Sequence, residues 1–367
     1  MEIKTYNKDQ LAELINSDLF KTMPVIPIST HRAISHIHNP RADKDDTLMI
    51  IVYEKNEMIG YLGVLADRIY TLNEEELKCG WLSCMWVDPV LRGKGIAKQL
   101  LATAFKTWND HLLVTEFTPE AKGLYDRSGG FNDLRVNEGL RCYLRFNLHE
   151  VVPKKGEKYK KYIPLLRIVD IMANVPNSVR LLFHKPKLNA GLRFEIIKEI
   201  DKDLDSYILS KSKNSFERRT ADDINWILRY PWLKESVPTV ESMRYHFSSV
   251  ADKFLNTNVI IKEGNRIVGY LLLTIRDGHL KVPYGYFERE IRMDVIQYIY
   301  SIMMDQRLNM LTVFHKDIVA YISSHSTPFI YKRHIKRNYI ISKALDAHFS
   351  DREELDIQDG DADCAFT

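Results

Sequence analysis

The sequence predicts an α/β (α+β) fold organised as two domains, and three observations support this. The 367 residues exceed the size at which a single hydrophobic core usually stops growing. Apolar segments with strand spacing and helix spacing alternate along the chain. A hairpin pattern occurs twice, as NEMIGYL at 56–62 and as NRIVGYL at 265–271, each time between two apolar strands. This internal repeat predicts a duplicated domain.

The elements of each half follow from their apolar spacing. The clearest is a helix after a glycine loop, because Ile96, Leu100, Leu101 and Ala104 fall on one broad face. The first half predicts strands at 1–7, 47–53, 58–67, 81–87, 111–117 and 140–148, and helices at 8–20, 96–108 and 118–128. The second half predicts a strand and helix within 196–209, the repeated hairpin, helices at 295–304 and 317–324, and strands at 308–315, 328–333 and 337–345. We therefore predict a first domain over 1–150, a linker over 151–190 and a second domain over 191–367.

Composition and charge argue against several classes of protein. A hydrophobic content of 45% with 28% charged residues is typical of a globular protein. The net charge of +3 gives no indication of a nucleic-acid partner. The first residues lack the apolar core of a secretory signal, and no run approaches about 20 apolar residues. The four cysteines show no C-x-x-C spacing, so we predict free thiols, no metal site and a cytoplasmic location.

The predicted linker is basic and then amphipathic. Residues 153–161, PKKGEKYKK, carry five lysines against one glutamate, and 163–176 is an apolar segment with helical spacing. Such a stretch can lie on a membrane surface. It can also pack between two domains with its lysines in water. We favour the packing interpretation, because only this short segment supports membrane contact.

The stretch VDPVLRGKGIAKQLL, at 87–101, has the composition of a phosphate-binding loop. Glycines permit positive φ angles and let several backbone N–H groups turn toward one anion. The following helix adds its unsatisfied N–H groups, and Arg92 and Lys94 add positive charge. The third glycine of the dinucleotide fingerprint and the G-K-[ST] of the nucleotide P-loop are both missing. A plain strand-to-helix turn is the simpler alternative.

Two motifs in order resemble the GNAT superfamily of N-acetyltransferases. The pattern V-D-P-x-x-R-G-K-G-I-A is similar to the superfamily's pyrophosphate-binding motif for acetyl-coenzyme A. Downstream, TPEAKGLYDRSGGF places Ala121, Leu124 and Tyr125 at the family's spacing, with Thr118 where asparagine is usual and Gly130-Phe131 one residue late. The resemblance implies two GNAT-like domains, each a mixed, mainly antiparallel sheet flanked by helices. The second copy has no glycine loop and is degenerate.

The resemblance implies acetyl transfer from acetyl-CoA to a primary amine by direct attack in a ternary complex. Tyr125 is the implied general acid, and backbone amides around Met85 to Val87 are implied to polarise the thioester carbonyl. The implied cofactor-binding residues are Met85, Val87, Arg92, Gly93, Lys94, Gly95, Ile96, Ala97 and Thr118. A non-catalytic acyl-CoA-binding or scaffold protein is the alternative from another class.

The group that deprotonates the amine is left open by the sequence. Ser83 and Cys84 lie on the strand that enters the site, and His36 and His38 lie in a region that lines the acceptor side in this superfamily. The C-terminus turns apolar after an acidic run, as in enhanced-intracellular-survival-like relatives, where the terminal carboxylate reaches the first active site. We therefore include the Thr367 carboxylate as a catalytic candidate. The acceptor is expected to be a small-molecule or peptide amine, and oligomer formation is compatible with the sequence.

Overall fold

The computed structural model describes residues 1–350, 352 and 354–366 and divides the chain into two compact units. Unit 1 comprises Met1–Asn137, Lys198–Phe254 and Lys336–Thr367, and unit 2 comprises Glu138–Ile197 and Leu255–Ile335. The unit boundaries differ from those predicted at 150 and 190. Residues 198–254 and 336–366, expected in the second domain, group with the first unit.

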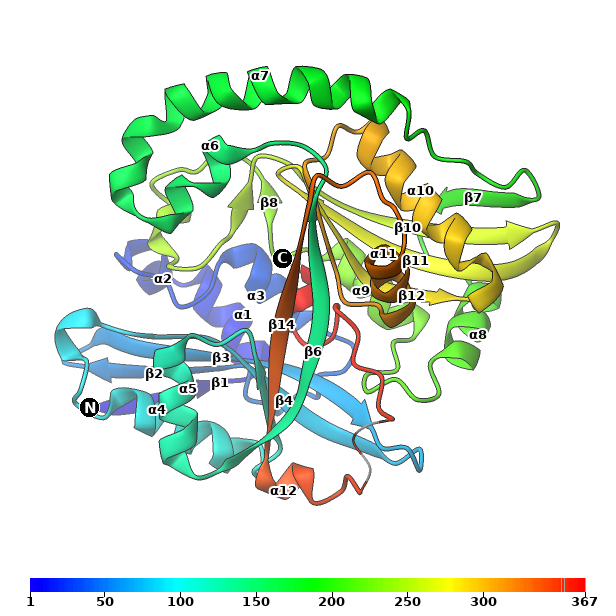
Figure 1. Cartoon of the computed structure of the whole chain (residues 1–367). Helices are drawn as coiled ribbons and strands as arrows, with labels where there is room; N and C mark the ends of the chain where they lie inside the picture. The colour runs from blue at the N-terminus through cyan, green and yellow to red at the C-terminus, as the bar shows by residue number, and fades with distance from the viewer. Residues whose placement is uncertain (351, 353, 367) are drawn as a thin grey trace. The chain divides into compact units, whose positions relative to one another are not determined.

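The helices and strands of both units can be followed in Figure 1. The helices are α1 Lys8–Asn16, α2 Asp18–Thr22, α3 Thr30–Ile37, α4 Ile96–Thr107, α5 Pro119–Ser128, α6 Leu148–Val151, α7 Ile163–Leu182, α8 Lys202–Lys211, α9 Ala221–Arg229, α10 Arg292–Asp305, α11 Lys316–Ser324 and α12 Lys343–Asp346. The strands are β1 Glu2–Tyr6, β2 Met49–Glu54, β3 Glu57–Tyr70, β4 Glu76–Val87, β5 Leu112–Thr115, β6 Phe131–Tyr143, β7 Leu192–Ile197, β8 Lys234–Glu235, β9 Val250–Ala251, β10 Phe254–Glu263, β11 Arg266–Arg276, β12 His279–Phe287, β13 Met310–Val313 and β14 Tyr331–Ser342.

Each unit contains a mixed, mainly antiparallel sheet with helices, which confirms the predicted fold class. Unit 1 has the strand order β1-β2-β3-β4-β5-β14, in which only β4 and β5 pair in parallel. Unit 2 has the order β6-β13-β12-β11-β10-β7, in which β12 and β13 pair in parallel. The run β2-β3-β4-α4-β5-α5-β6 thus has the same order as β10-β11-β12-α10-β13-α11-β14. This shared order supports the duplication predicted from the repeated hairpin.

The last strand of each run contributes to the difference between the predicted domain bounds and the compact units. β14 ends the second run, yet its residues 339–341 pair with β5 in unit 1. β6 ends the first run, and its residues 140–143 pair with β13 in unit 2. A sequence pattern predicts a strand but not its partner, because pairing depends on contacts far apart in the chain.

Several predicted elements differ in extent. The helix predicted at 8–20 is two helices, because Ser17 caps α2 by accepting a hydrogen bond from the Phe20 N–H. The two late strands predicted at 328–333 and 337–345 are the single strand β14. The region with His31, His36 and His38, to which no element was assigned, contains α3.

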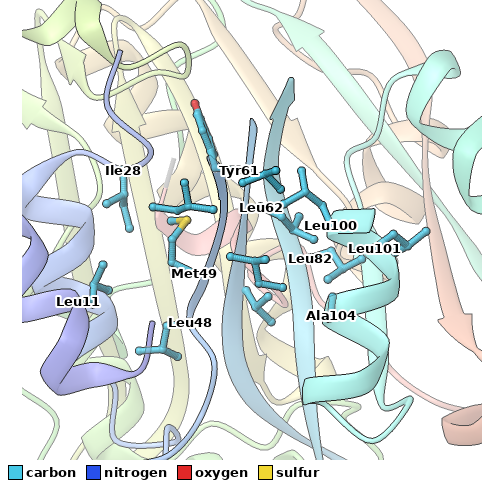
Figure 2. Close-up of a cluster of buried hydrophobic side chains, with 14 of the residues drawn as sticks. Leu11, Ile28, Leu48, Met49, Tyr61, Leu62, Leu82, Leu100, Leu101 and Ala104 are labelled. Atoms are coloured by element: carbon cyan, nitrogen blue, oxygen red, sulfur yellow. The ribbon is translucent and has the colours of Figure 1, made fainter. Parts of the chain in front are cut away.

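The core of unit 1 lies between the sheet and its helices. Figure 2 shows the α4 side chains Leu100 and Ala104 on the side of the helix that faces the strands, close to Leu62 and Leu82, with Leu101 beside them on α4. These side chains are at most 5% exposed. Burying each large one contributes about 1.5–3 kcal/mol, so α4 is fixed on the sheet and its N-terminus is held at the end of β4.

A buried ion network joins the first two chain segments of unit 1, Met1–Asn137 and Lys198–Phe254. Arg41 binds Asp223 through Nε and Nη2, at 2.8 and 2.6 Å, and Asp67 through Nη1 at 2.7 Å. Arg219 binds the same Asp67 carboxylate at 3.1 and 2.8 Å. Arg219 also pairs with Glu217, and all five side chains are at most 6% exposed. Paired carboxylates and guanidinium groups of this kind tolerate burial only while each has its partner.

The C-terminal tail docks into unit 1, as its apolar end predicts. Cys364, Ala365 and Phe366 are buried. The Phe366 ring stacks on Trp232, with ring centroids 4.5 Å apart and planes at 14°. The tail is also attached to the ion network, because the Ala362 N–H donates to Glu217 Oε1 at 3.0 Å. Thr367 lies outside the described residues.

Replacing Phe366 with alanine should strongly destabilise the protein. The ring is fully buried, and removing such a ring typically costs about 3–5 kcal/mol. We expect a loss of this size in the free energy of unfolding from urea denaturation. The matched control is Phe183→Ala, since Phe183 is 84% exposed. Equal stability of F366A and F183A would show that the tail does not pack as described.

The Asp361 carboxyl should make stability depend on pH in an unusual direction. Burial and then the charge of Glu217 raise the pKa of Asp361 well above its usual range. In the unfolded chain an aspartate releases its proton near pH ~3.9. Above that pH the folded protein therefore holds more protons than the unfolded chain, and this group's contribution to stability falls as pH rises.

The Asp361→Asn variant removes this titration while keeping a similar shape. We expect the two proteins to have similar free energies of unfolding near pH 4. The variant should then gain stability over the parent as pH is raised toward 8, measured by urea denaturation at each pH. A constant difference over this range would contradict the raised pKa.

Candidate active site

A cleft of about 950 Å³ in unit 1 brings the two sequence motifs together. β4 and β5 pair in parallel from Gly80 to Leu82 and from Leu112 to Val114. β4 then continues beyond this register to Val87. The cleft is lined by the end of β4, the glycine loop, one face of α4 and the α5 side chains that include Ala121 and Leu124.

The glycine loop has the backbone conformation that its composition predicts. Gly93 and Gly95 have φ angles of +84° and +81°, in the left-handed region that favours glycine. Gly95 is the N-cap of α4 and supplies no side-chain cap. The first N–H groups of α4 therefore have no side-chain acceptor at the cap, and Arg92 and Lys98 line the cleft beside them. An anion would find donors and positive charge here.

Most of the predicted cofactor-binding residues line this cleft, but one does not. Lys94 is exposed and is not part of the lining. The residues that do line the cleft are Met85, Val87, Arg92, Gly93, Gly95, Ile96, Ala97 and Thr118. Thr118 also has a structural role, since its side chain caps α5 by accepting a hydrogen bond from the Ala121 N–H at 3.3 Å. The remaining lining includes apolar groups such as Leu101 and Phe105 and one carboxylate, Glu120.

A β-bulge at the end of β4 redirects the strand where it enters the cleft. Tyr61 pairs with Trp86 and Gly63 with Ser83, so Leu62 faces the two residues Cys84 and Met85. Cys84 has a φ angle of +58°, which is rare for a residue other than glycine. Such bulges occur next to active sites because they turn backbone groups away from the ladder. No pattern in the sequence indicates this bulge.

Tyr125 is buried next to the cleft rather than in its lining. Its side chain is 4% exposed and lies between the rings of Phe117 and Phe131, with centroids 6.1 and 5.4 Å away. Its neighbours Leu124 and Ser128 do line the cleft. Burial raises the pKa of Tyr125 to about 12. The phenol is therefore neutral around pH 7 and can act as a hydrogen-bond donor.

Arg32 of α3 organises a second group of polar side chains on β4, which we call the β4 polar cluster. Its guanidinium donates to Cys84 Sγ at 2.7 Å, to Ser83 Oγ at 2.8 Å and to the Tyr245 hydroxyl at 3.0 Å. Ser83 in turn donates to the Asp363 carboxylate in the C-terminal tail. The cluster thus comprises Arg32, Ser83, Cys84, Tyr245 and Asp363.

Aromatic rings hold this cluster in place. The Arg32 guanidinium carbon lies 3.7 Å from the centroid of the Trp232 ring. This is the same ring that stacks on Phe366. Cation–π contact of this kind is worth about 2 kcal/mol or more when the cation is removed from water. The cluster therefore depends on the packed position of the tail.

The histidine candidates have different surroundings. His36 is fully buried, stacks on Trp232 at 5.2 Å, and accepts from Arg32 Nε at 3.5 Å. Burial and then the positive charge of Arg32 lower the pKa of His36 well below its usual value, so this side chain is neutral. His38 instead stacks on Tyr230, with centroids 4.7 Å apart. Neither histidine lines the cleft.

Three members of the cluster have no signal in the sequence. Arg32, Tyr245 and Asp363 lie in three segments that are remote from one another in the chain. Each is an ordinary polar residue in its own sequence neighbourhood. Only the folding of residues 198–254 and of the tail against the first segment brings them together.

Comparison with known proteins agrees with this fold. The fold and the cleft motifs place the chain in the class of GNAT-fold proteins. Residues 10–131 match the family model described as "Acetyltransferase (GNAT) family", which confirms the resemblance seen in the motifs. No curated protein matches the chain in sequence.

Solved structures extend the similarity of fold to both units. One is a probable N-acyltransferase from Enterococcus faecalis V583, with a TM-score of 0.55 and 12% identity over 94% of this chain and 73% of that chain. Another is the Saccharomyces cerevisiae N-myristoyltransferase with bound myristoyl-CoA, with a TM-score of 0.50 and 11% identity over 93% of this chain and 78% of that chain. At these identities the similarity is one of fold.

Adding a methyl group at Gly95 should weaken coenzyme A binding specifically. Alanine fits the space, because no atom lies within 4 Å of an added Cβ, but the φ of +81° strains it. Gly264 is a matched control, since its φ is +60° and its surroundings are equally open. We expect both alanine variants to lose about 1–2 kcal/mol of stability. Only Gly95→Ala should raise the Kd for coenzyme A in calorimetry, and an equal affinity in the two variants would contradict a ligand-binding role for the loop.

Proposed function

We propose that this protein transfers an acyl group from a coenzyme A thioester to a primary amine, and that the acyl group is acetyl. One observation carries the proposal: the end of β4 with its bulge, the uncapped N-terminus of α4 and the second motif on α5 all border one cleft. The match of residues 10–131 to the GNAT family supports the same chemistry. A thioester supplies an activated acyl group with a thiolate leaving group.

The residues of the cleft suit the parts of a coenzyme A thioester. Arg92, Lys98 and the first N–H groups of α4 would hold the pyrophosphate, by charge and by backbone donors. Leu101 and Leu124 give apolar surface for the pantetheine arm. Backbone amides around Met85 to Val87 would donate to the thioester carbonyl, as fixed dipoles that need no reorganisation during the reaction.

Tyr125 is proposed to stabilise the departing thiolate. With its pKa raised to about 12, the phenol stays protonated across the neutral range and is a weaker acid than the free thiol. A thiol has a pKa of about 8.5. Hydrogen-bond donation to the thiolate is therefore easier than complete proton transfer, and the proton can reach the sulfur from the phenol or later from water.

The β4 polar cluster is proposed to border the acceptor amine. It includes Ser83 and Cys84 on the strand next to Met85 and brings Asp363 of the tail to that strand. The amine must lose a proton to attack, since a lysine-like amine is mostly protonated at neutral pH. The Thr367 carboxylate stays a candidate for this role as a prediction from the sequence alone.

The proposed activity is tested by incubating the protein with acetyl-CoA and a broad panel of small-molecule and peptide amines. Release of free thiol reports turnover with any acceptor. Longer acyl-CoA thioesters in the same assay determine which chain length is used. Binding of acetyl-CoA without thiol release on any amine would favour a non-catalytic acyl-CoA-binding protein instead.

Tyr125→Phe should reduce kcat without preventing coenzyme A binding. Loss of one hydrogen bond to a charged group typically costs about 1.5–3 kcal/mol, which corresponds to roughly 10- to 150-fold in kcat. The matched control is Tyr300→Phe, which removes the hydroxyl of a buried tyrosine in unit 2 and should leave kcat unchanged. An unchanged kcat in Y125F, with acetyl-CoA affinity also unchanged, would exclude the proposed role of the phenol.

A further inference from the structure

Helix α7 carries a broad apolar face that is exposed. The helix spans Ile163–Leu182 and is labelled in Figure 1. On this face the large apolar side chains are between 40% and 70% exposed, and the Phe183 ring that follows the helix is 84% exposed. The exposed members include Leu165, Ile168, Met172 and Val179. The interpretation favoured from the sequence, in which this segment packs between domains, stays a prediction, but within unit 2, to which α7 belongs, these side chains are left exposed.

The opposite face of α7 is turned toward the protein and carries three polar side chains together with the buried Leu181. Asp170 accepts from the backbone N–H groups of Leu148 and His149, at 2.8 and 2.9 Å. Asn177 donates to the carbonyl of residue 144 at 2.9 Å. Asn174 both accepts from the N–H and donates to the carbonyl of residue 146. These hydrogen bonds fix the rotation of α7 about its own axis. Its apolar face therefore points away from the residues that the helix packs on.

The width of the apolar face identifies the kind of surface it fits. At 3.6 residues per turn, the exposed apolar side chains from Leu165 to Phe183 occupy an arc of about 160°. Within this arc there is no charged residue in the sequence, and Arg167 and Arg180 lie beyond its two edges. A two-helix contact needs only a narrow seam, whereas a helix lying in a membrane interface presents a wide apolar face.

The charges at both ends of α7 favour an anionic surface. Lys155, Lys158, Lys160 and Lys161 precede the helix with one acidic residue among them, Glu157, which pairs with Lys160 at 2.7 Å. Lys185 and Lys187 follow the helix. Two copies of this helix packed face to face would place lysines against lysines in either orientation, because both ends are basic. Anionic lipid headgroups would instead neutralise both ends, at about 1 kcal/mol for each lysine near the surface.

We propose that α7 binds in the plane of a membrane that contains anionic lipid. Its apolar face enters the boundary between headgroups and acyl chains, and the flanking lysines contact the headgroups. In the described part of the chain, no helix is long and apolar enough to cross a bilayer. The inference does not depend on the proposed acyltransferase activity.

Vesicle sedimentation with the full chain tests the proposal. The probes are vesicles of phosphatidylcholine alone and of phosphatidylcholine mixed with phosphatidylserine. We expect sedimentation with the anionic vesicles and less of it as salt is raised, because salt screens the lysines. Equal binding to both vesicle types, or no binding at excess lipid, would overturn the proposal.

Two sets of variants separate the apolar and the charged contributions. The double variant Ile168→Ser with Met172→Ser should lower the partition coefficient into anionic vesicles roughly tenfold or more, since each change removes apolar surface from the membrane interface. The matched control is Ile196→Ser on β7, which should leave the partition coefficient unchanged. Ile196 is 70% exposed, as is Met172. Lys158→Gln with Lys161→Gln should reduce the preference for phosphatidylserine. Thermal unfolding checks that these surface variants stay folded. Unaltered binding by I168S/M172S overturns the proposal, as does a dimer that this pair dissociates in light scattering without any vesicle binding.

Discussion

The rest of unit 1 depends on the buried pairing of Arg41 and Arg219 with three carboxylates, one of which both arginines share. Asp67 accepts from both guanidinium groups, while Asp223 accepts from Arg41 and Glu217 pairs with Arg219. Removing one member would leave a buried charge without its partner, which typically costs about 3–5 kcal/mol. Because the network links β3, residues 217–223 and the tail through the Ala362 N–H, it determines which segments can contribute to the cluster on β4.

The end of β4 lies beside both the proposed reaction cleft and the side chains whose positions depend on the ion network. Met85 and Val87 line the cleft, while Ser83 and Cys84 are held by Arg32. The bulge at Cys84 lies between these two environments and permits one strand to supply both. The Arg32 guanidinium stacks on Trp232, and Trp232 stacks on Phe366, so the strand, α3 and the tail form one packed arrangement. The geometry of the proposed acceptor side thus depends on residues far from the glycine loop in sequence.

Local features were predictable from the sequence and distant contacts were not. The glycine loop, α4 and the repeated hairpin follow from spacing within a few residues, and the structure contains all of them. The left-handed angles of Gly93 and Gly95 were expected because glycine tolerates them. The swapped pairings of β6 and β14 and the position of residues 198–254 depend on contacts between segments far apart in the chain. Cys84 has a positive φ angle, which is rare for residues other than glycine. The sequence around it therefore gives no indication of the bulge.

Helix α7 illustrates a different limit of prediction from sequence. The apolar periodicity predicts the helix, but it does not predict which face of the helix packs on the protein. An apolar stripe normally faces the core, since burial of apolar surface drives folding. Here Asp170, Asn174 and Asn177 satisfy backbone groups between residues 144 and 149, which would otherwise lack these partners. Leaving such groups unsatisfied costs about 1–3 kcal/mol each. Leu181 on the same face is buried in the core of unit 2, so turning the helix over would lose polar and apolar contacts together. These contacts therefore set the rotation, and the apolar face is left for a partner outside the chain.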